Sequence, residues 1–374
     1  MNRDLAPTYQ RLFGSHWVLW YEKSNIYSIV EPDFKHLLDT YLSSNTSITF
    51  GTKLGLTDTS AITEHIQSYI AQCHTTSFDT DSLVDVHFKD CRRHISKHYA
   101  CFGNAFQVNF DTDLVEKTIH PSIAHLEMNE AIPPDVVFDI YLEQDQLCLF
   151  KDELLLRRVP KKDYHLIQGK FVMELLSFIH HKNESDWIGT FHGSTISDGT
   201  NAILLIGASG KGKSTLSALL VAHGFEVVAD DVSPLLFEDK HIYYNPSAIS
   251  LKKGAFEVLT PLISSFDRIP ETLFNKNKGS IKYFNPNPPL KPSYPCKALI
   301  MVNYSKGKTT TLKPLSVKVP LETLIPDSWL SPNPKHAQHF LDWLEDLELY
   351  QLTYSDTQSV IEEVSSLFKT LRKP

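Results

Sequence analysis

Aromatic and β-branched runs separated by short polar breaks open the chain. His16–Tyr21 and Asn25–Val30 are parted by a polar tripeptide, which predicts two strands joined as a hairpin. Apolar residues then recur at a helical period in Pro32–Leu42 and in Ser60–Cys73. The pattern predicts a small α+β module over residues 1–75.

Residues 76–186 are rich in short runs typical of strands. The runs are Leu83–Phe88, Ala105–Phe110, Val136–Leu142, Leu147–Phe150 and Glu153–Arg158. Polar pairs between the last three favour an antiparallel meander. His165–His181 then shows the apolar period of a helix. We expect this region to form the β-rich N-terminal part of the unit that follows it.

From residue 187 to 374, strand and helix patterns alternate, as in an α/β fold. Trp187–Ser197 predicts one strand that turns into a second, fully apolar strand, Ala202–Ile206. Helix Ser214–Ala222 and strand Phe225–Ala229 come next. Later elements are expected at Ile242–Tyr244, Ala248–Lys252, Ala255–Leu262, Cys296–Tyr304, Lys335–Leu347, Tyr350–Tyr354 and Thr357–Leu371. The polar stretch Glu271–Pro292, which holds several Lys, Pro and Gly residues, predicts a mobile loop.

Composition narrows the classes of function. The formal net charge of −8 argues against a nucleic-acid or anionic-membrane binder, because either would need a basic surface. No apolar run approaches the ~18 residues of a membrane span, and the N-terminus lacks the apolar stretch of a secretory signal. The five scattered cysteines indicate free thiols in a reducing compartment. A cytoplasmic protein is expected.

A phosphate-binding pattern lies between the strand Ala202–Ile206 and the helix after it. The segment Gly207-Ala208-Ser209-Gly210-Lys211-Gly212-Lys213-Ser214 fits G-x-x-x-x-G-K-[ST] without a gap. Backbone N–H groups and the positive end of the helix converge on phosphate oxygens in such a loop. Lys213 would reach the outer phosphates, and the Ser214 hydroxyl would ligate Mg²⁺. The residues expected to bind ATP are Gly207, Ser209, Gly210, Lys211, Gly212, Lys213, Ser214 and Thr215.

Two adjacent carboxylates, Asp230 and Asp231, end the strand Phe225–Ala229. We expect that strand to lie next to the P-loop strand, so that the carboxylates face the phosphates across one crevice. One can hold Mg²⁺, which prefers oxygen ligands, and the other can deprotonate an attacking hydroxyl. Adjacent strand residues point oppositely, so both reach the site only if the chain turns, which Val232-Ser233-Pro234 would permit.

The order His192-Gly193, then the P-loop, then Val228-Ala229-Asp230-Asp231 resembles the HPr kinase family. The resemblance is closer to the HPr-kinase-related kinases found beside peptide natural-product genes; it covers about residues 80–370 and is motif-specific over 187–235. It implies a phosphoenolpyruvate-carboxykinase-like P-loop kinase core over residues 187–374, Mg-ATP, and phosphoryl transfer to a serine hydroxyl. It also implies that Asp230 is the catalytic base, that Ser214 and Asp231 serve Mg²⁺, and that His192 lies near the transferred phosphate.

Residues 1–75 resemble, by pattern alone, the winged-helix PqqD-like modules that bind leader peptides. Such modules add the peptide as a strand to a sheet edge. The resemblance implies that these residues recruit a peptide or protein acceptor, such as the precursor of a ribosomal natural product.

The chain departs from HPr kinase itself downstream of the aspartates. That family carries a glycine-rich signature with an acid and an arginine, whereas Ala248–Gly254 lacks the acid and offers Lys252 in place of the arginine. This departure leaves open whether HPr is a substrate and whether a reverse phosphatase activity exists. Lys252 is the first candidate for stabilising charge in the transition state, followed by Lys282 and Lys278.

Two other functions stay open. One is a small-molecule or free-serine P-loop kinase, although the few arginines after the P-loop and the β-rich region ahead of it differ from shikimate-type kinases. The other is a non-catalytic adaptor that binds ATP and presents a peptide, which the intact Lys213, Ser214, Asp230 and Asp231 disfavour. HPr kinases are hexamers, so a homo-oligomer also stays open.

Overall fold

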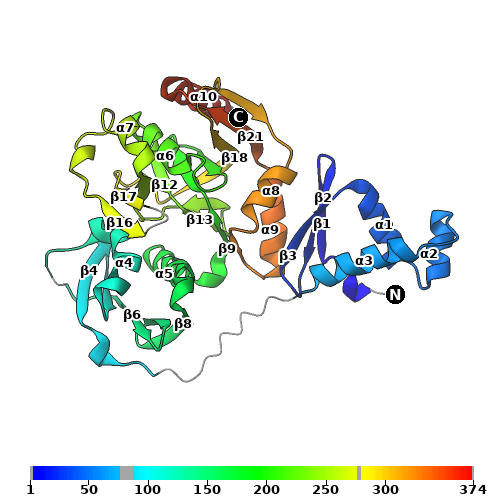
Figure 1. Cartoon of the computed structure of the whole chain (residues 1–374), viewed down its shortest axis with the longest axis horizontal. Helices are drawn as coiled ribbons and strands as arrows, with labels where there is room; N and C mark the ends of the chain where they lie inside the picture. Colours follow the sequence, from blue (N-terminus) through cyan, green and yellow to red (C-terminus); the bar gives the residue numbers. More distant parts are fainter. Residues whose placement is uncertain (1–2, 76–86, 131, 276–278, 373–374) are drawn as a thin grey trace.

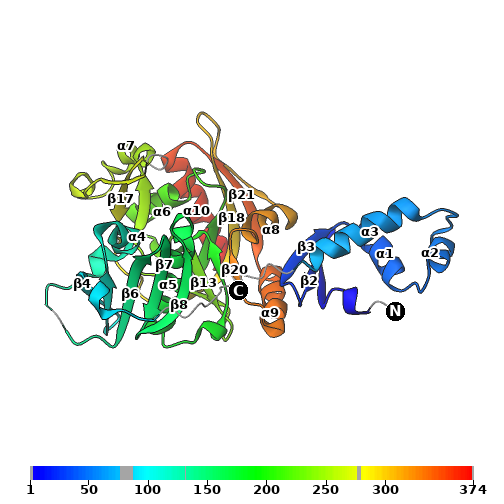
Figure 2. The same ribbon diagram turned by 60° about the horizontal axis from the view of Figure 1, so that its bottom comes forward.

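The computed structural model describes residues 3–75, 87–130, 132–275 and 279–372. These residues form an elongated molecule in which the N-terminal helices and strands occupy one end (Figures 1 and 2). Four sheets are present in this described part, with three, ten, three and five strands.

The N-terminal sheet is an antiparallel meander of β1 (Tyr9–Phe13), β2 (His16–Tyr21) and β3 (Ile26–Val30). Helices α1 (Pro32–Leu42), α2 (Ser47–Leu54) and α3 (Ser60–Cys73) follow it. The predicted hairpin and the two predicted helices are confirmed. Strand β1 and helix α2 were not predicted. The first is an edge strand with only one buried residue, and the second is a short helix that depends on a capping box between Thr46 and Thr49.

One face of this N-terminal sheet packs on its own helices, and the other packs on α9 (Pro334–Glu345) near the C-terminus. The ring of Tyr27 meets that of Phe340 edge to face, with 5.3 Å between centroids. Arg11 forms ion pairs with Asp342 and Glu345 of the same helix. Helix α9 therefore lies between the N-terminal sheet and the rest of the molecule (Figure 2).

The five-stranded sheet has the order β4-β5-β6-β7-β8. Its strands are β4 (Ile95–Cys101), β5 (Asn104–Phe110), β6 (Val136–Glu143), β7 (Gln146–Lys151) and β8 (Leu154–Pro160). Helices α4 (Asp113–Ile123) and α5 (Tyr164–Ile179) pack on one face through a shared apolar core. The predicted meander and helix are confirmed. Most of the predicted strand Leu83–Phe88 lies outside the described residues, and His87 and Phe88 are not in a strand.

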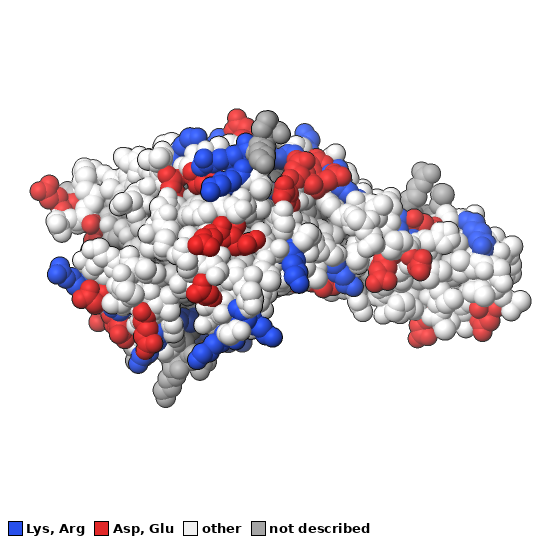
Figure 3. Space-filling view, turned by 90° about the horizontal axis from the view of Figure 1, so that it is seen from above, with Lys and Arg blue, Asp and Glu red and all other residues white. Residues whose placement is uncertain are grey.

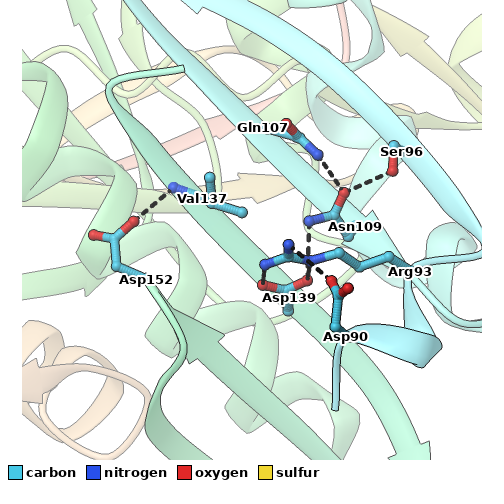
Figure 4. A network of polar contacts seen from close by, with 8 residues as sticks. All are labelled: Asp90, Arg93, Ser96, Gln107, Asn109, Val137, Asp139 and Asp152. Atoms are coloured by element: carbon cyan, nitrogen blue, oxygen red, sulfur yellow. Dashed lines mark hydrogen bonds and ion pairs between the residues drawn. The ribbon is translucent and has the colours of Figure 1, made fainter. Parts of the chain in front are cut away.

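The other face of this sheet is covered by residues 87–94, which we call the strap. Arg93 of the strap donates two hydrogen bonds to the buried Asp139 of β6, at 2.7 and 2.9 Å (Figure 4). Asn109 of β5 donates a third, from Nδ2 to Asp139 Oδ1, at 2.9 Å. The carboxylate is thus fully engaged, as a charge removed from water requires.

The central sheet runs β12-β10-β11-β18-β14-β13-β9-β20, with β21 beside β18 and β19 beside β21. The strands are β9 (Trp187–His192), β10 (Ser194–Ser197), β11 (Ala202–Ile206), β12 (Glu226–Ala229), β13 (Val232–Leu236), β14 (His241–Tyr243), β18 (Ser293–Tyr304), β19 (Thr311–Pro314), β20 (Trp329–Leu330) and β21 (Glu348–Tyr354). Helices α6 (Lys213–Ala222) and α10 (Thr357–Leu371) cover one face, while α8 (Lys318–Leu324) and α9 cover the other. Buried residues of β11 alternate between these two cores, as strand geometry requires.

Three sequence predictions in this region are wrong. Trp187–Ser197 is two strands, β9 and β10, separated at Gly193. Glu271–Pro292 is not a loop throughout, because β16 (Thr272–Asn275) and β17 (Gly279–Phe284) form a sheet with β15 (Ile249–Lys252). The helix predicted over Ala255–Leu262 is shorter, since α7 covers Phe256–Leu259. In Glu271–Pro292, pairing of β17 with β15 outweighed the polar composition of the segment.

Two properties of the described residues bear on partners. Each of their helices is too short or too polar to traverse a bilayer. On the face drawn in Figure 3, Lys and Arg side chains are interspersed with Asp and Glu and do not merge into one basic surface.

Candidate active site

The glycine-rich segment joins a buried strand to a helix. Strand β11 is buried along its whole length, and α6 begins directly after Gly212. Among the described residues, no side chain caps the N-terminus of α6. The first backbone N–H groups of the helix therefore lack a side-chain acceptor, and together with the positive helix end they suit a bound anion.

Two glycines of the loop are required by their surroundings. Gly207 has φ of 142°, and a Cβ there would lie 2.9 Å from the carbonyl oxygen of Val302 in β18. Gly212 has φ of 96°, and a Cβ there would lie 2.8 Å from the Tyr354 hydroxyl of β21. Both positions combine a left-handed backbone with close contact, so only glycine fits them without strain. The loop is therefore held against β18, which pairs with β11, and against β21, which lies beyond β18.

Lys213 lies across the loop that precedes it. Its Nζ donates a hydrogen bond of 2.6 Å to the carbonyl oxygen of Gly207, and the residue is only 9% exposed. Burial lowers the pKa of Lys213, and the carboxylates of Asp231, Asp230 and Asp327 oppose this shift. Of the other predicted nucleotide-binding residues, Ser209, Gly210 and Lys211 are exposed on the loop, while Ser214 and Thr215 lie half-buried in the first turn of α6.

Asp230 is buried beside the start of α6. Its side chain is bonded by the hydroxyls of Ser194 and Ser214 and by the backbone N–H of Ser250. Burial raises the pKa of Asp230 to about 6; the charge of Asp231 adds to the rise, and the hydrogen bonds oppose it. A buried carboxylate bonded to the Ser214 hydroxyl provides two oxygen donors in one place, which fits a hard divalent cation such as Mg²⁺.

Asp231 occupies the opposite environment. Its side chain is 73% exposed, and its Oδ1 lies 3.3 Å from Nδ1 of His192 at the end of β9. Asp231 has φ of 69°, and the N–H of Val232 donates to the carbonyl oxygen of Asp230 at 2.9 Å. The turn that separates the two carboxylates is therefore centred on Asp231. The predicted turn at Val232-Ser233-Pro234 is wrong, because these residues belong to β13.

The expected neighbour relation between β12 and β11 is also wrong. Strand β10 lies between them and is antiparallel to both. The carboxyl ends of β11 and β12 therefore reach the same edge of the sheet, where Ser194 begins β10 and bridges the gap to Asp230. Gly193, at the break between β9 and β10, allows β11 to lie close, since a Cβ there would be 2.7 Å from the carbonyl oxygen of Leu205.

The three lysines considered for stabilising charge in the transition state differ in position. Nζ of Lys252 lies 3.4 Å from the Ser209 hydroxyl, so this exposed lysine borders the loop. Lys282 is buried and donates to the carbonyl oxygens of Phe266 and Asp267 at 3.0 and 3.1 Å, which is a structural role. Lys278 lies outside the described residues.

A cavity of about 300 Å³ opens beside His192 and Asp231. It lies among β8, α5, β9 and the segment that enters β20, and it includes Arg157 and Asp327. Sequence reasoning missed Ser194, Asp327 and Arg157. Arg157 and Asp327 stand in segments without a recognisable motif, and Ser194 follows His192-Gly193 without being part of the pattern; all three reach the site through the tertiary fold.

Comparisons with known proteins add little to this geometry. No protein-family model matches the chain, and no curated protein does so. Among solved structures, the Hpr(Ser) kinase/phosphatase from Coxiella burnetii matches at 12% identity, over 49% of this chain and 95% of that one, with a TM-score of 0.22. A TM-score this low supports no conclusion about fold or activity.

Proposed function

We propose that the protein is an ATP-dependent kinase that transfers the γ-phosphate to a hydroxyl group. The observation that carries this proposal is that the adjacent residues Asp230 and Asp231 lie in different environments. Asp230 is buried against Ser214 at the start of α6, and Asp231 is exposed beside His192 and the cavity. A kinase that uses ATP needs an oxygen ligand for Mg²⁺ beside the phosphates and a base beside the acceptor hydroxyl.

The family resemblance implies that Asp230 is the base and that Asp231 serves Mg²⁺. The geometry favours the reverse assignment. Ser214 and Asp230 would hold Mg²⁺, which supplies charge neutralisation on the phosphates when bound. Asp231 would take the proton of the attacking hydroxyl, since its carboxylate is exposed to the cavity, whereas Asp230 is only 2% exposed. His192 would orient the Asp231 carboxylate.

The remaining residues bind and orient the nucleotide. The N–H groups at the start of α6 and the Lys213 ammonium would hold the outer phosphates, with Lys213 leaving the Gly207 carbonyl to do so. Lys252, beside Ser209 on the exposed side of the loop, is the nearest candidate for balancing the charge that develops in transfer. Recruitment of a peptide acceptor by residues 1–75 remains part of this proposal.

The test compares wild type with Asp231→Asn and Asp230→Asn in ADP release and in affinity for ATP with Mg²⁺. Asn is the right replacement at 231 because it tolerates the left-handed backbone found there. We expect Asp231→Asn to keep its ATP affinity and to lose ~10²–10⁴-fold in rate. We expect Asp230→Asn to weaken binding of Mg-ATP. Wild-type turnover by Asp231→Asn would refute the assignment of the base, and a wild-type protein that binds no ATP would refute the kinase.

A further inference from the structure

The N-terminal sheet shares an apolar core with β9, the strand that ends at His192. Val18 of this sheet belongs to the same buried cluster as Phe191 and Phe340, and Val18 and Phe340 are fully buried. Removing apolar surface from water stabilises one arrangement of the packed parts. Residues 3–75, which we call the N-terminal module, are therefore packed onto the part of the chain that carries the candidate site.

The turn between β2 and β3 of this module reaches the edge of the central sheet. Strand β20 ends the strand order of that sheet. Nδ2 of Asn25 donates to the carbonyl oxygen of Leu330 in β20 at 2.8 Å, and Oδ1 of Asn25 accepts from Nε1 of Trp20 at 2.9 Å. Asn25 has φ of 53°, which Asn adopts more readily than most residues. Its amide is thus fixed at both atoms, and it supplies the donor that an edge carbonyl needs.

Residues 327–331, which we call the wall segment, carry this edge carbonyl into the candidate site. Asp327 and Trp329 line the cavity beside the proposed base. The Ser328 hydroxyl accepts from the backbone N–H of His192 at 3.3 Å. The wall segment therefore contacts the N-terminal module at one residue and the candidate site at the neighbouring ones.

The helices on either side of the wall segment meet the same module. Glu31 lies 3.8 Å from Nζ of Lys318 in α8. On α9, Phe340 packs against Tyr27, and Arg11 forms ion pairs with the same helix. The module thus contacts the chain before, within and after the wall segment, and so holds it against β9 from outside.

We propose that the N-terminal module positions the wall segment, with Asn25 as the positioning residue, and so contributes to phosphoryl transfer to every acceptor. This inference rests on the proposed kinase function, and it gives the module a role distinct from recruiting a peptide. His192 orients the carboxylate of Asp231, and Ser328 of the wall segment holds the His192 backbone. Loosening the wall segment would therefore displace the proposed base and leave the glycine-rich loop in place.

Asn25→Asp is the sharpest variant, because it removes only the Nδ2 donor. A carboxylate tolerates the left-handed turn and still accepts from Trp20. Asn25→Gly also keeps the turn and removes the side chain without adding a charge. Asn45→Asp is the matched control, since Asn45 is exposed between α1 and α2 of the same module.

The experiment uses the full chain and two readouts. Hydrogen exchange of the wall segment is followed by mass spectrometry, which needs no turnover. ADP release and ATP affinity are measured with Mg²⁺, with and without free L-serine, a probe too small to pair with the module as a strand.

We expect both variants of Asn25 to speed exchange of the wall segment and to lower kcat at least about threefold, as the loss of one hydrogen bond allows. ATP affinity should be unchanged, and Asn45→Asp should match wild type in every measurement. Wild-type exchange in both variants of Asn25, or faster exchange at an unchanged kcat, would overturn the proposal. An equal loss of ATP affinity and kcat would overturn it too, since it would show general damage to the fold. A wild type that releases no ADP would refute the kinase, whereas the exchange comparison would still decide whether the module holds the wall segment.

Discussion

Asp230 and Asp231 are adjacent in the chain but have opposite surroundings. The first is 2% exposed and bonded by Ser194 and Ser214, and the second is 73% exposed beside His192. Burial disfavours the charged form of a carboxylate, so the folded protein carries an energetic cost at Asp230. Sites that bind ions commonly carry such a cost in the free protein.

This cost predicts a pH dependence of stability. The pKa of Asp230 is about 6 in the folded protein, against an ordinary value of 3.8. Between these values the folded state holds a proton that the unfolded chain has released, so the free energy of unfolding falls as pH rises through this window. By linkage, the fall amounts to about 3 kcal/mol and stays constant at higher pH.

Urea unfolding of wild type and Asp230→Asn at pH 4 and pH 7 checks this prediction. Asn cannot titrate, so the difference in stability between the two proteins should change by about 2.4 kcal/mol between pH 4 and pH 7. Parallel pH profiles for the two proteins would show that Asp230 is not the group responsible.

At the scale of elements, hydrogen bonds and ion pairs to buried aspartates hold two segments, the start of β10 and the strap, in place against the sheets. Ser194 at the start of β10 joins the ends of β11 and β12. The strap is held to the five-stranded sheet in the same manner, by the fork of Arg93 on Asp139. In each case a buried aspartate orients an adjoining segment.

Removing Arg93 should therefore be costly. Arg93→Ala leaves the Asp139 carboxylate, whose side chain is 2% exposed, without its charged partner. We expect a loss of about 3 kcal/mol in the free energy of unfolding, measured in urea. Lys89→Ala is the matched control on the strap, because Lys89 pairs with Glu143 but is itself 43% exposed. It should cost less than about 1 kcal/mol, and equal losses would contradict the role given to Asp139.

At the scale of the whole molecule, residues 3–75 contact the rest through α9, through a hydrogen bond from Asn25 to the Leu330 carbonyl oxygen and through an ion pair between Glu31 and Lys318. Phe340 of α9 meets Tyr27 on the N-terminal side, and Trp343 of the same helix stacks on Phe191 of β9 at 5.1 Å. Phe191 precedes His192 and lines the cavity. The N-terminal sheet and the candidate site thus share a packed aromatic contact.

Weakening this contact should release the N-terminal end without unfolding it. In the double variant Arg11→Ala, Tyr27→Ala, the ion pairs with α9 and an aromatic pair worth ~0.5–1.5 kcal/mol are removed. We expect a larger radius of gyration in X-ray scattering with unchanged helix content. Leu12→Ala, an exposed residue of the same sheet, is the control and should leave the radius unchanged. An unchanged radius in the double variant would show that other contacts hold the two parts together.

The sequence by itself determined most of the local elements and the chemistry-bearing residues. The glycine-rich loop, the helix after it and the aspartate pair could be found because a short stretch must contain all the residues that such a loop needs. Helices such as Thr357–Leu371 were predicted to their end residues because one apolar stripe specifies the element.

Only the tertiary structure decided how these parts meet. The strand order, with β10 between β11 and β12, depends on pairings that leave no local mark. Burial of Asp230 and exposure of Asp231 depend on a left-handed turn and on Ser194, and the cavity depends on Arg157, Gly169 and Asp327 from distant segments. Periodicity reports which face of an element is buried, but it does not report what covers that face, and the covering groups set the roles of the two carboxylates.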